Sequence, residues 1–341
     1  MKNINRILPV SKIILLCSIL LFAFTSCDDS SSGDGADTTS KPIIQTGDFF
    51  SDSNWNDPHV IHDGTQFVMF ASASQSFDHN VKIYRLVSAD GIDWELSPSS
   101  AVFERSTSGW DRNSVETPAV VYYDGEYHMF YTGYETVYSD SGNFKIGHAT
   151  SPDGITWTRQ GMILQPTDPG GAVNMDFNQY VVAEPAPVVF NGNIYLYFTA
   201  VGANAGVGTT LQVIGLSTYN GSTWTSPVQV LEPDQSIYLR TGGPIDYIGY
   251  STPNAIVRNG KMHLYFDVVA DPWKQVKIHH AVSDDGTSGW IHDSAPLLNR
   301  EDFTWTQEEI RSPSALEYNN KLYLYFAGHT GFNLAIGLEI Y

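Results

Sequence analysis

The chain has 341 residues, which is enough for one large all-β domain or for two ordinary domains. Hydrophobic residues make up 42% and aromatic residues 13%, so the chain has ample material for a packed β core and aromatic side chains to spare. Lys and Arg number 18 against 37 Asp and Glu, and the formal net charge of −19 repels phosphate backbones. We therefore expect no nucleic-acid partner.

Residues 1–27 predict an export signal. Basic residues come first, an apolar run from Ile13 to Phe24 follows, and small residues precede Cys27. The apolar run is too short to span a bilayer. Its end resembles a bacterial lipobox, whose cysteine is acylated, so we expect an exported lipoprotein. The lipid on Cys27 would hold it at the outer membrane, facing the periplasm or the cell surface. An ordinary cleaved signal with an incidental Cys27 is the alternative.

Residues 28–45 predict a flexible acidic tether that leads to a folded domain at 46–341. The stretch DDSSSGDGADTTSKP is rich in Ser, Gly and Thr and has almost no apolar side chain to bury. The second cysteine of the chain, Cys17, lies in the segment that cleavage removes. We therefore expect no intramolecular disulfide.

One phrase occurs five times along the domain: a proline, a short apolar strand, a tight polar turn, and a strand rich in Tyr and Phe. The prolines that mark the five copies are Pro58, Pro118, Pro185, Pro253 and Pro313. Most turns are Asp-Gly or Asn-Gly, which tolerate the positive φ angles of hairpins, and the flanking residues alternate as strands do. Each copy therefore predicts a β-hairpin.

A second phrase follows the first four hairpins: a strand, a polar turn and a tryptophan, at Trp94, Trp157, Trp224 and Trp290. The two phrases together supply the four strands of a propeller blade. The sequence thus predicts an all-β, five-bladed β-propeller with four-stranded antiparallel blades. The fifth copy ends early, and we expect residues 43–50 to supply its missing outer strand and close the ring. We interpret the Asp-Gly turns after Ser88 and Ser151 as structural, with their tryptophans packed between blades.

The hairpin phrases resemble those of the five-bladed propeller glycosidases, above all glycoside hydrolase family 43 and more distantly family 32, over roughly residues 50–341. In family 43, acids at the openings of three inner strands converge on a central funnel as base, pKa modulator and acid. The resemblance implies that Asp57 is the general base, Glu184 the general acid and Glu116 the modulator. Both glutamates depart from the family's spacing to proline. We favour Glu184 as the acid, but the choice between it and Glu116 stays open.

The resemblance also bears on the rest of the site. It implies that Arg311 lies near the base and binds the substrate, and that the reaction inverts the anomeric centre through a water held between base and acid. It allows a central calcium held through a histidine that opens a late blade. The openings YSTP and IRSP lack one, so we expect no metal and no other cofactor. The adjacent His279 and His280 should point to opposite faces of a strand, which argues against one shared metal.

Three tryptophans near the inner strands are candidates for stacking on a sugar ring, with packing between blades as the alternative: Trp55, Trp110 and Trp305. Trp273 is a weaker candidate of the same kind. We interpret Glu308 and Glu309 as part of a solvated face. A single Asp before a proline usually starts a turn. Acids beside the repeated proline in the first three copies favour catalysis instead.

These observations predict a monomeric glycoside hydrolase that cleaves glycosidic bonds of plant or algal polysaccharides and oligosaccharides. Arabinofuranosyl or xylosyl units are the expected substrates, by the resemblance to family 43. A non-catalytic surface lipoprotein that binds glycans on the same propeller is the alternative, because the two glutamates depart from the family pattern.

Overall fold

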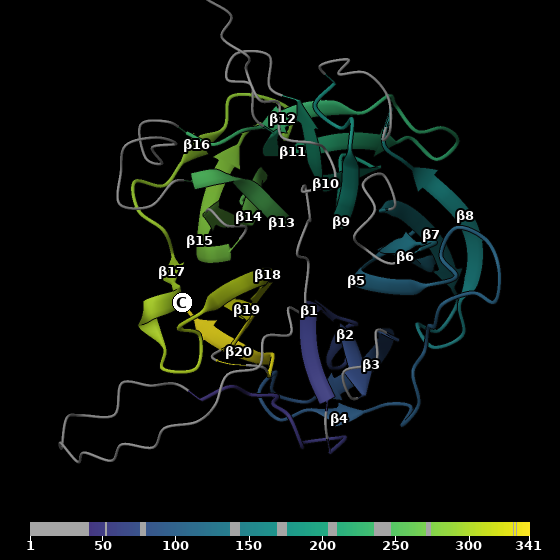
Figure 1. The fold of residues 1–341 in the computed structure, drawn as a ribbon, viewed down its shortest axis with the longest axis vertical. Coiled ribbons are helices and arrows are strands. Elements are labelled where there is room, and N and C mark those ends of the chain that lie inside the picture. Colours follow the sequence, from purple (N-terminus) through teal and green to yellow (C-terminus); the bar gives the residue numbers. More distant parts are fainter. Residues whose placement is uncertain are drawn as a thin grey trace, which may run out of the picture.

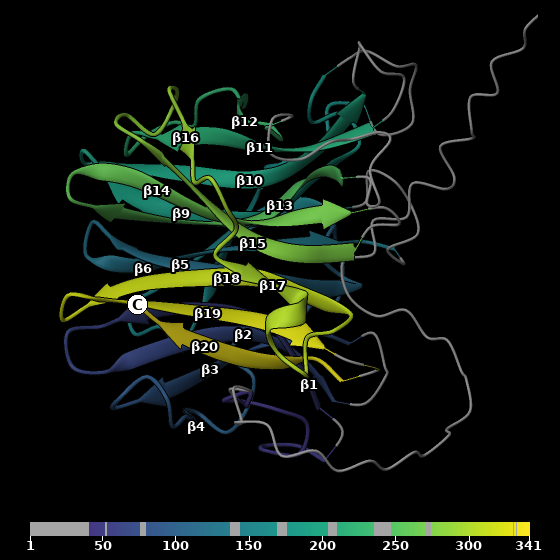
Figure 2. The same cartoon turned by 90° about the vertical axis from the view of Figure 1, so that its left-hand side faces the viewer.

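The computed structural model describes residues 41–51, 53–75, 80–136, 144–168, 176–203, 210–234, 247–270, 274–329, 331 and 333–341. Within them the fold is all-β apart from one short 3-10 helix at Arg300–Asp302. The strands are arranged around a central axis in Figure 1 and run from one face of the molecule to the other in Figure 2. The export signal, Cys27, most of the tether and Trp273 lie outside the described residues, so those predictions stay predictions.

Each copy of the hairpin phrase begins a group of antiparallel strands. The first group is β1 (Ser53–His62), β2 (Phe67–Gln75), β3 (Lys82–Ser88) and β4 (Glu95–Leu96). The second is β5 (Ser114–Tyr123), β6 (Glu126–Tyr134), β7 (Lys145–Ser151) and β8 (Thr158–Leu164). The third is β9 (Val181–Phe190), β10 (Asn193–Ala203), β11 (Thr210–Tyr219) and β12 (Val228–Leu231). The fourth is β13 (Tyr247–Arg258), β14 (Lys261–Ala270), β15 (Lys274–Ser283), β16 (Ile291–His292) and β17 (Leu298–Asn299). The fifth is β18 (Glu309–Tyr318), β19 (Lys321–His329) and β20 (Ala335–Ile340).

Hydrogen bonding joins the described strands into four sheets. The first and second groups are four-stranded, the fifth is three-stranded, and the third and fourth belong to one nine-stranded sheet. A single parallel bridge between Gln212 and Gly249 links these two groups, and every other described pairing is antiparallel. The prediction of an all-β fold with four-stranded antiparallel sheets is confirmed.

The inner strands form a ring around the axis. Strands β1, β5, β9, β13 and β18 contact one another in this order, and β18 contacts β1 (Figure 1). Each inner strand has a β-bulge at its repeated proline. The residue before the proline has a φ between 44° and 56° at every copy, which are Asp57, Thr117, Glu184, Thr252 and Ser312. Such left-handed non-glycine residues are uncommon, and five at equivalent positions mark the centre of the ring as a candidate site.

The N-terminal segment meets the last strand, as expected. Ile44 forms an antiparallel bridge with Ile336 of β20, and the backbone N–H of Ile336 donates to the carbonyl of Ile44 at 2.8 Å. The pairing is one bridge and not a full strand, because the chain then turns to the first group. There Phe50 stacks on Trp55 with ring centroids 6.1 Å apart. The segment therefore joins the first and last groups.

The tryptophans of the second phrase pack between groups, as predicted. Each lies edge-on to an aromatic ring of the group before it, and the pairs are Trp94–Tyr325, Trp157–Phe70, Trp224–Phe130 and Trp290–Tyr197. The turn after Ser88 is held by Asp90, whose Oδ1 accepts the backbone N–H groups of Ile92 and Asp93. The structural interpretation of these turns is confirmed.

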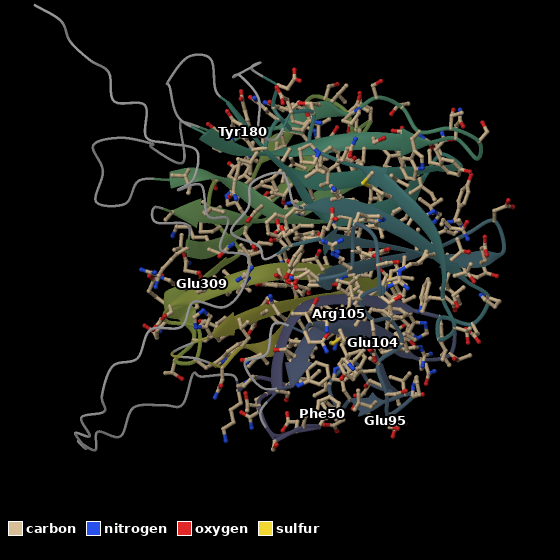
Figure 3. All side chains as sticks on the ribbon, turned by 45° about the vertical axis from the view of Figure 1, so that its right-hand side comes forward. Phe50, Glu95, Glu104, Arg105, Tyr180 and Glu309 are labelled. Carbon is tan, nitrogen blue, oxygen red and sulfur yellow. The ribbon has the colours of Figure 1, made fainter. Side chains whose placement is uncertain are left out.

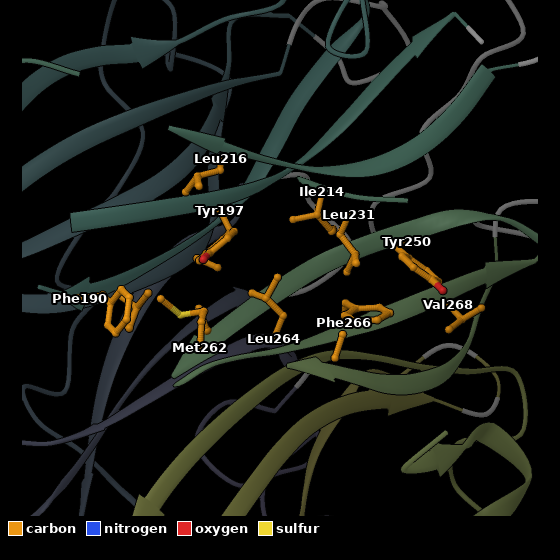
Figure 4. Packing of buried hydrophobic residues seen from close by; sticks show 14 residues of the cluster. Phe190, Tyr197, Ile214, Leu216, Leu231, Tyr250, Met262, Leu264, Phe266 and Val268 are labelled. Atoms are coloured by element: carbon orange, nitrogen blue, oxygen red, sulfur yellow. The ribbon is translucent and has the colours of Figure 1, made fainter. Parts of the chain in front are cut away.

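Apolar side chains fill the space between neighbouring groups. Between the third and fourth groups, Tyr197 and Leu216 pack against Met262 and Leu264 in one buried cluster (Figure 4). Close packing of this kind resists displacement of the strands, so the inner strands hold the central residues in fixed positions. Among the described residues no helix is long and apolar enough to cross a membrane.

Candidate active site

The residues before the repeated prolines line one small pocket at the centre of the ring. Asp57, Glu184 and Ser312 are among them, with Thr117 and Thr252 between the charged positions. Asp57 is 5% exposed and Glu184 is 2% exposed. The structure therefore brings the predicted base and one predicted acid together, buried, from the first and third groups.

Asp57 is held as a hydrogen-bond acceptor. The hydroxyl of Ser312 donates to its Oδ1 at 2.8 Å. Burial raises the pKa of Asp57, while the positive charge of Arg311 and the Ser312 hydrogen bond oppose this rise. Arg311 is 2% exposed. Its charge acts on Asp57, which agrees with the prediction that it lies near the base.

Glu116 lies one residue before Thr117 on β5 and is also buried. Burial raises its pKa well above the ordinary value, and the negative charges of Asp57 and Glu184 raise it further. The charge of Arg311 and a hydrogen bond with Tyr134 act in the opposite direction. Glu116 is therefore close enough to both other acids to interact with them, and its environment favours the protonated form.

Glu184 has different surroundings. Its Oε2 accepts a hydrogen bond from the hydroxyl of Thr199 at 2.5 Å and another from the backbone N–H of Thr252 at 2.9 Å. Its own backbone N–H donates to Thr132 at 2.8 Å. Three residues of three different groups thus fix this residue, and Oε2 serves as an acceptor.

Arg311 has a carboxylate partner that the sequence analysis did not assign. Its Nη1 lies 3.4 Å from Oε2 of Glu309, which also lies 3.1 Å from Nε2 of His329. Burial alone would raise the pKa of Glu309, but the His329 hydrogen bond and the charge of Arg311 bring it below the ordinary value. The interpretation of Glu309 as solvated was therefore wrong, whereas Glu308 is an exposed partner of Lys274. Figure 3 shows Glu309 at the start of β18.

A fourth buried carboxylate, Asp267 of β14, was missed altogether. It is 0% exposed, and its Oδ2 accepts the backbone N–H of Ser312 at 3.1 Å. Burial raises its pKa well above the ordinary value, and the charge of Arg311 opposes this. The signal was present in the repeat, because Asp267 occupies the position held by Ser or Thr in the second strands of the first three copies.

Trp55 does not face a ligand. It is 0% exposed and packs against Phe49, Phe50 and Tyr84. A ring with no free face cannot stack on a sugar, so the prediction that it binds substrate was wrong. The side chain belongs to the core between the N-terminal segment and the first group.

Trp110 and Trp305 also pack, each against a buried cluster formed by two neighbouring groups. Trp110 stacks on Tyr131 with ring centroids 5.6 Å apart, and Trp305 stacks on Phe326 at 5.5 Å. Neither lines the central pocket. The described structure thus places both in the packing role that was their alternative.

Several buried polar atoms around the ring accept or donate no hydrogen bond within the described part of the chain. They belong to residues on inner strands, and are Asn56 Oδ1, Ser114 Oγ and Ser251 Oγ. Buried polar groups are usually paired, so these atoms mark positions where a polar ligand or water can complete the bonding. A sugar, with a hydroxyl on most carbons, is such a ligand.

No three His, Cys, Asp or Glu side chains of the described residues form a group suited to a metal ion. The adjacent histidines have separate environments: His279 is fully buried beside Phe266, and Nε2 of His280 lies 2.9 Å from Nδ1 of His263. This agrees with their expected placement on opposite faces of β15. The titratable and charged side chains of the described site are carboxylates, the guanidinium of Arg311 and the imidazole of His59, which lines the central pocket.

Comparison with known proteins bears on the resemblance to the propeller glycoside hydrolases. The sequence model described as the glycosyl hydrolases family 32 N-terminal domain matches residues 112–238, about a third of the chain. The resemblance to the propeller glycoside hydrolases is confirmed. No curated protein matches the chain.

Several solved structures share the fold. The BT0996 complex with RGII has a TM-score of 0.67 at 13% identity, covering 89% of this chain and 91% of that one. A thermostable family-43 glycoside hydrolase has a TM-score of 0.65 at 15% identity, covering 86% and 92%. The endo-arabinase from Bacteroides thetaiotaomicron VPI-5482 has a TM-score of 0.59 at 14% identity, covering 88% and 96%. At these identities the likeness concerns the fold, and activity must be argued from the site.

Proposed function

We propose that this chain is a glycosidase on a five-bladed propeller, with its site at the centre of the ring. The observation that carries the proposal is the gathering of Asp57, Glu116 and Glu184 with Arg311 at that centre, all of them buried. Hydrolysis of an acetal needs one carboxyl group that carries a proton and one that is ionised at the same pH. The different surroundings of these acids supply that difference.

Asp57 is the base in this proposal. The hydroxyl of Ser312 and the charge of Arg311 both favour its ionised form, and an ionised carboxylate can take a proton from water. The water then attacks the anomeric carbon from the face opposite the leaving group, which gives inversion.

Glu116 is the group whose surroundings best suit a general acid. Burial and two neighbouring negative charges keep it protonated to higher pH than an ordinary glutamate, so it can donate to the departing oxygen. Oε2 of Glu184 already accepts two hydrogen bonds, which suits a carboxylate that holds the site in shape. We therefore assign the acid to Glu116 and the modulating role to Glu184, the reverse of the assignment that the resemblance favoured.

Plant or algal glycans are the substrates we propose, with arabinofuranosyl or xylosyl units first. The names of the structures that share the fold support this order, since one is an endo-arabinase and another is a complex with RGII. We further propose an exported monomeric lipoprotein, anchored at the outer membrane through Cys27, that works without a metal or other cofactor. Its formal net charge of −19 suits neutral glycans rather than phosphate polymers.

The test is release of reducing sugar from arabinans, xylans, galactans and aryl glycosides by the protein lacking residues 1–27. Asp57→Asn should lower turnover on the accepted glycan by at least about a hundredfold. Asp111→Asn is the matched control, because Asp111 is a buried acid whose partners Arg159 and Tyr131 lie away from the central pocket. Unchanged turnover in Asp57→Asn would remove the proposed base. Binding of glycans without release from any of them would favour the lectin alternative.

Substrates with different leaving groups distinguish the roles of Glu116 and Glu184. An acid is needed less when the leaving group is already a stable anion, so loss of the acid is severe on a natural glycan and mild on a dinitrophenyl glycoside. We expect this pattern for Glu116→Gln. Glu184→Gln should instead lose similar factors on both substrates. The opposite assignment follows if Glu184→Gln alone has the leaving-group dependence.

A further inference from the structure

The second strands of the five groups share one position that lies against the ring of inner strands. The residue there pairs with the residue two places before the repeated proline, and the five occupants are Ser72, Thr132, Thr199, Asp267 and Ala327. In the first three groups the hydroxyl accepts a backbone N–H from the next group. Ser72 accepts from Thr117 at 2.9 Å, for example. This position therefore links each group to the following one.

Asp267 makes the same link with a charged side chain. Its Oδ2 accepts the N–H of Ser312 at 3.1 Å, the equivalent of the Thr199 bond to Thr252 at 2.8 Å. A carboxylate costs far more to bury than a hydroxyl. Since a hydroxyl makes this link elsewhere in the ring, the link alone does not account for an aspartate at a position with 0% exposure.

The charge of Asp267 has a partner in the site. The positive charge of Arg311 is the largest effect that favours its ionised form, and the negative charge of Glu184 opposes ionisation. Arg311 acts in the same way on Asp57. The fourth and first groups therefore place one carboxylate each where both interact with the same buried guanidinium.

Ser312 connects these two carboxylates directly. Its backbone N–H donates to Asp267, and its hydroxyl donates to Asp57 at 2.8 Å. Ser312 has a left-handed φ of 54°, which few non-glycine residues adopt without support. The hydrogen bond to Asp267 supplies such support to the residue that holds the proposed base.

We propose that Asp267 is a fourth carboxylate of the active site and a positioning residue, which holds Ser312 and shares the charge of Arg311 with Asp57. This inference rests on the proposed function and adds a residue to it. Ionised Asp267 competes with Asp57 for the charge of Arg311, so replacing its carboxylate leaves more of that positive charge to Asp57 and lowers the pKa of Asp57. Loss of the Asp267 carboxylate should therefore move the acidic limb of activity, which reports ionisation of Asp57, towards lower pH.

The test compares three variants of Asp267 over the pH range of activity. Asp267→Asn and Asp267→Ser remove the charge but keep an acceptor for Ser312, whereas Asp267→Ala removes both. We expect the pH profile of kcat/KM to move down by about half a unit or more in both Asn and Ser variants. Asp267→Ala should in addition lose turnover at all pH values. A profile that stays in place in Asn and Ser, or moves to higher pH, overturns the proposal.

A second measurement does not need turnover. Arg311→Met leaves the buried carboxylates without their cation and should lower the urea midpoint at pH 7.5. Adding Asp267→Asn should restore part of this loss, because it removes one uncompensated charge. If the double variant loses as much stability as the two single variants added together, Asp267 and Asp57 do not share the charge of Arg311. If the wild-type protein releases no sugar but this rescue occurs, the proposed function fails while the pairing of Asp267 with Arg311 stands.

Discussion

The hydroxyl of Ser312 donates a hydrogen bond to Oδ1 of Asp57 at 2.8 Å, although 255 residues separate the two in the chain. The bond joins the last inner strand to the first. The proposed base is therefore completed only when the ring closes, which couples the integrity of the fold to the chemistry of its site.

Ser312→Ala tests this coupling. Loss of the hydroxyl removes a donor that favours ionised Asp57, so the already raised pKa of Asp57 should rise further. A hydrogen bond to a charged group contributes about 1.5 to 3 kcal/mol, which corresponds to about one pKa unit or more. We expect the acidic limb of kcat/KM to move to higher pH, with about a tenfold loss on that limb.

Ser314→Ala is the control for that measurement. Its hydroxyl also crosses between the last and first groups, where it accepts the N–H of Val60 at 2.9 Å, away from the Asp57 carboxylate. The variant should lower stability and leave the acidic limb in place. Equal shifts in both variants would mean that the limb reports general loosening of the ring.

Trp55→Ala should lower stability without weakening substrate binding. The ring is fully buried, and its Nε1 donates to Ser53 at 3.0 Å. Replacing a buried tryptophan by alanine costs about 3 to 5 kcal/mol. Urea unfolding measures this loss, and KM on the accepted glycan should change by less than about twofold. A stable variant with a strongly raised KM would restore Trp55 as a sugar-binding residue.

The repeat in the sequence was enough to predict the strands and to bring Asp57 and Glu184 together. Both stand directly before a repeated proline, so any closed arrangement of equivalent strands places them around one axis. The inter-group tryptophans followed from the same repeat. The repeat therefore predicts where the strands lie along the chain and which residues meet around the axis.

Side-chain direction near the prolines could not be predicted. Alternation along a strand places Trp55 and Asp57 on the same face, yet the bulge after Asn56 and the φ of 50° at Asp57 break that alternation. Trp55 therefore packs in the core while Asp57 lines the pocket. Asp267 was not predicted for another reason. The equivalent residues of the first three copies carry hydroxyl groups, which have no charge that would indicate a catalytic position.

His148 should make the fold less stable in acid. It stacks between His128 and Phe130, and its Nε2 lies 3.0 Å from Nδ1 of His128. Burial and the neighbouring histidine lower its pKa from 6.5 to about 4. Because the folded pKa is the lower one, this stability is complete above pH 6.5 and falls as the pH drops towards 4.

His148→Phe isolates that contribution. The variant keeps an aromatic ring in the stack, so the unfolding free energy should fall less than in wild type between pH 7 and pH 4.5, by on the order of 2 kcal/mol. The raised pKa values of buried Asp57 and Glu116 make the fold less stable as the pH rises. The unfolding free energies of the two proteins must therefore be compared at the same pH. Parallel stability curves for the two proteins would exclude a titrating role for His148.

Two tyrosines allow ring closure to be compared with an ordinary contact between consecutive groups. Tyr325 donates from its hydroxyl to the carbonyl of Gly91 at 3.0 Å and joins the last group to the first. Tyr197 makes the equivalent bond to Gly286 at 2.7 Å between the third and fourth groups. Each replacement by phenylalanine should cost about 1 kcal/mol at equilibrium, since one buried hydrogen bond is lost.

The kinetic consequences should differ. The Tyr325 bond spans 234 residues and the Tyr197 bond spans 89, and contacts that close longer loops form later because of their entropic cost. A contact that is absent from the transition state of folding affects only unfolding. Tyr325→Phe should therefore speed unfolding in concentrated urea by about fivefold, the full effect of its equilibrium cost, and Tyr197→Phe by less. Equal unfolding rates would mean that the ring does not open first where its ends meet.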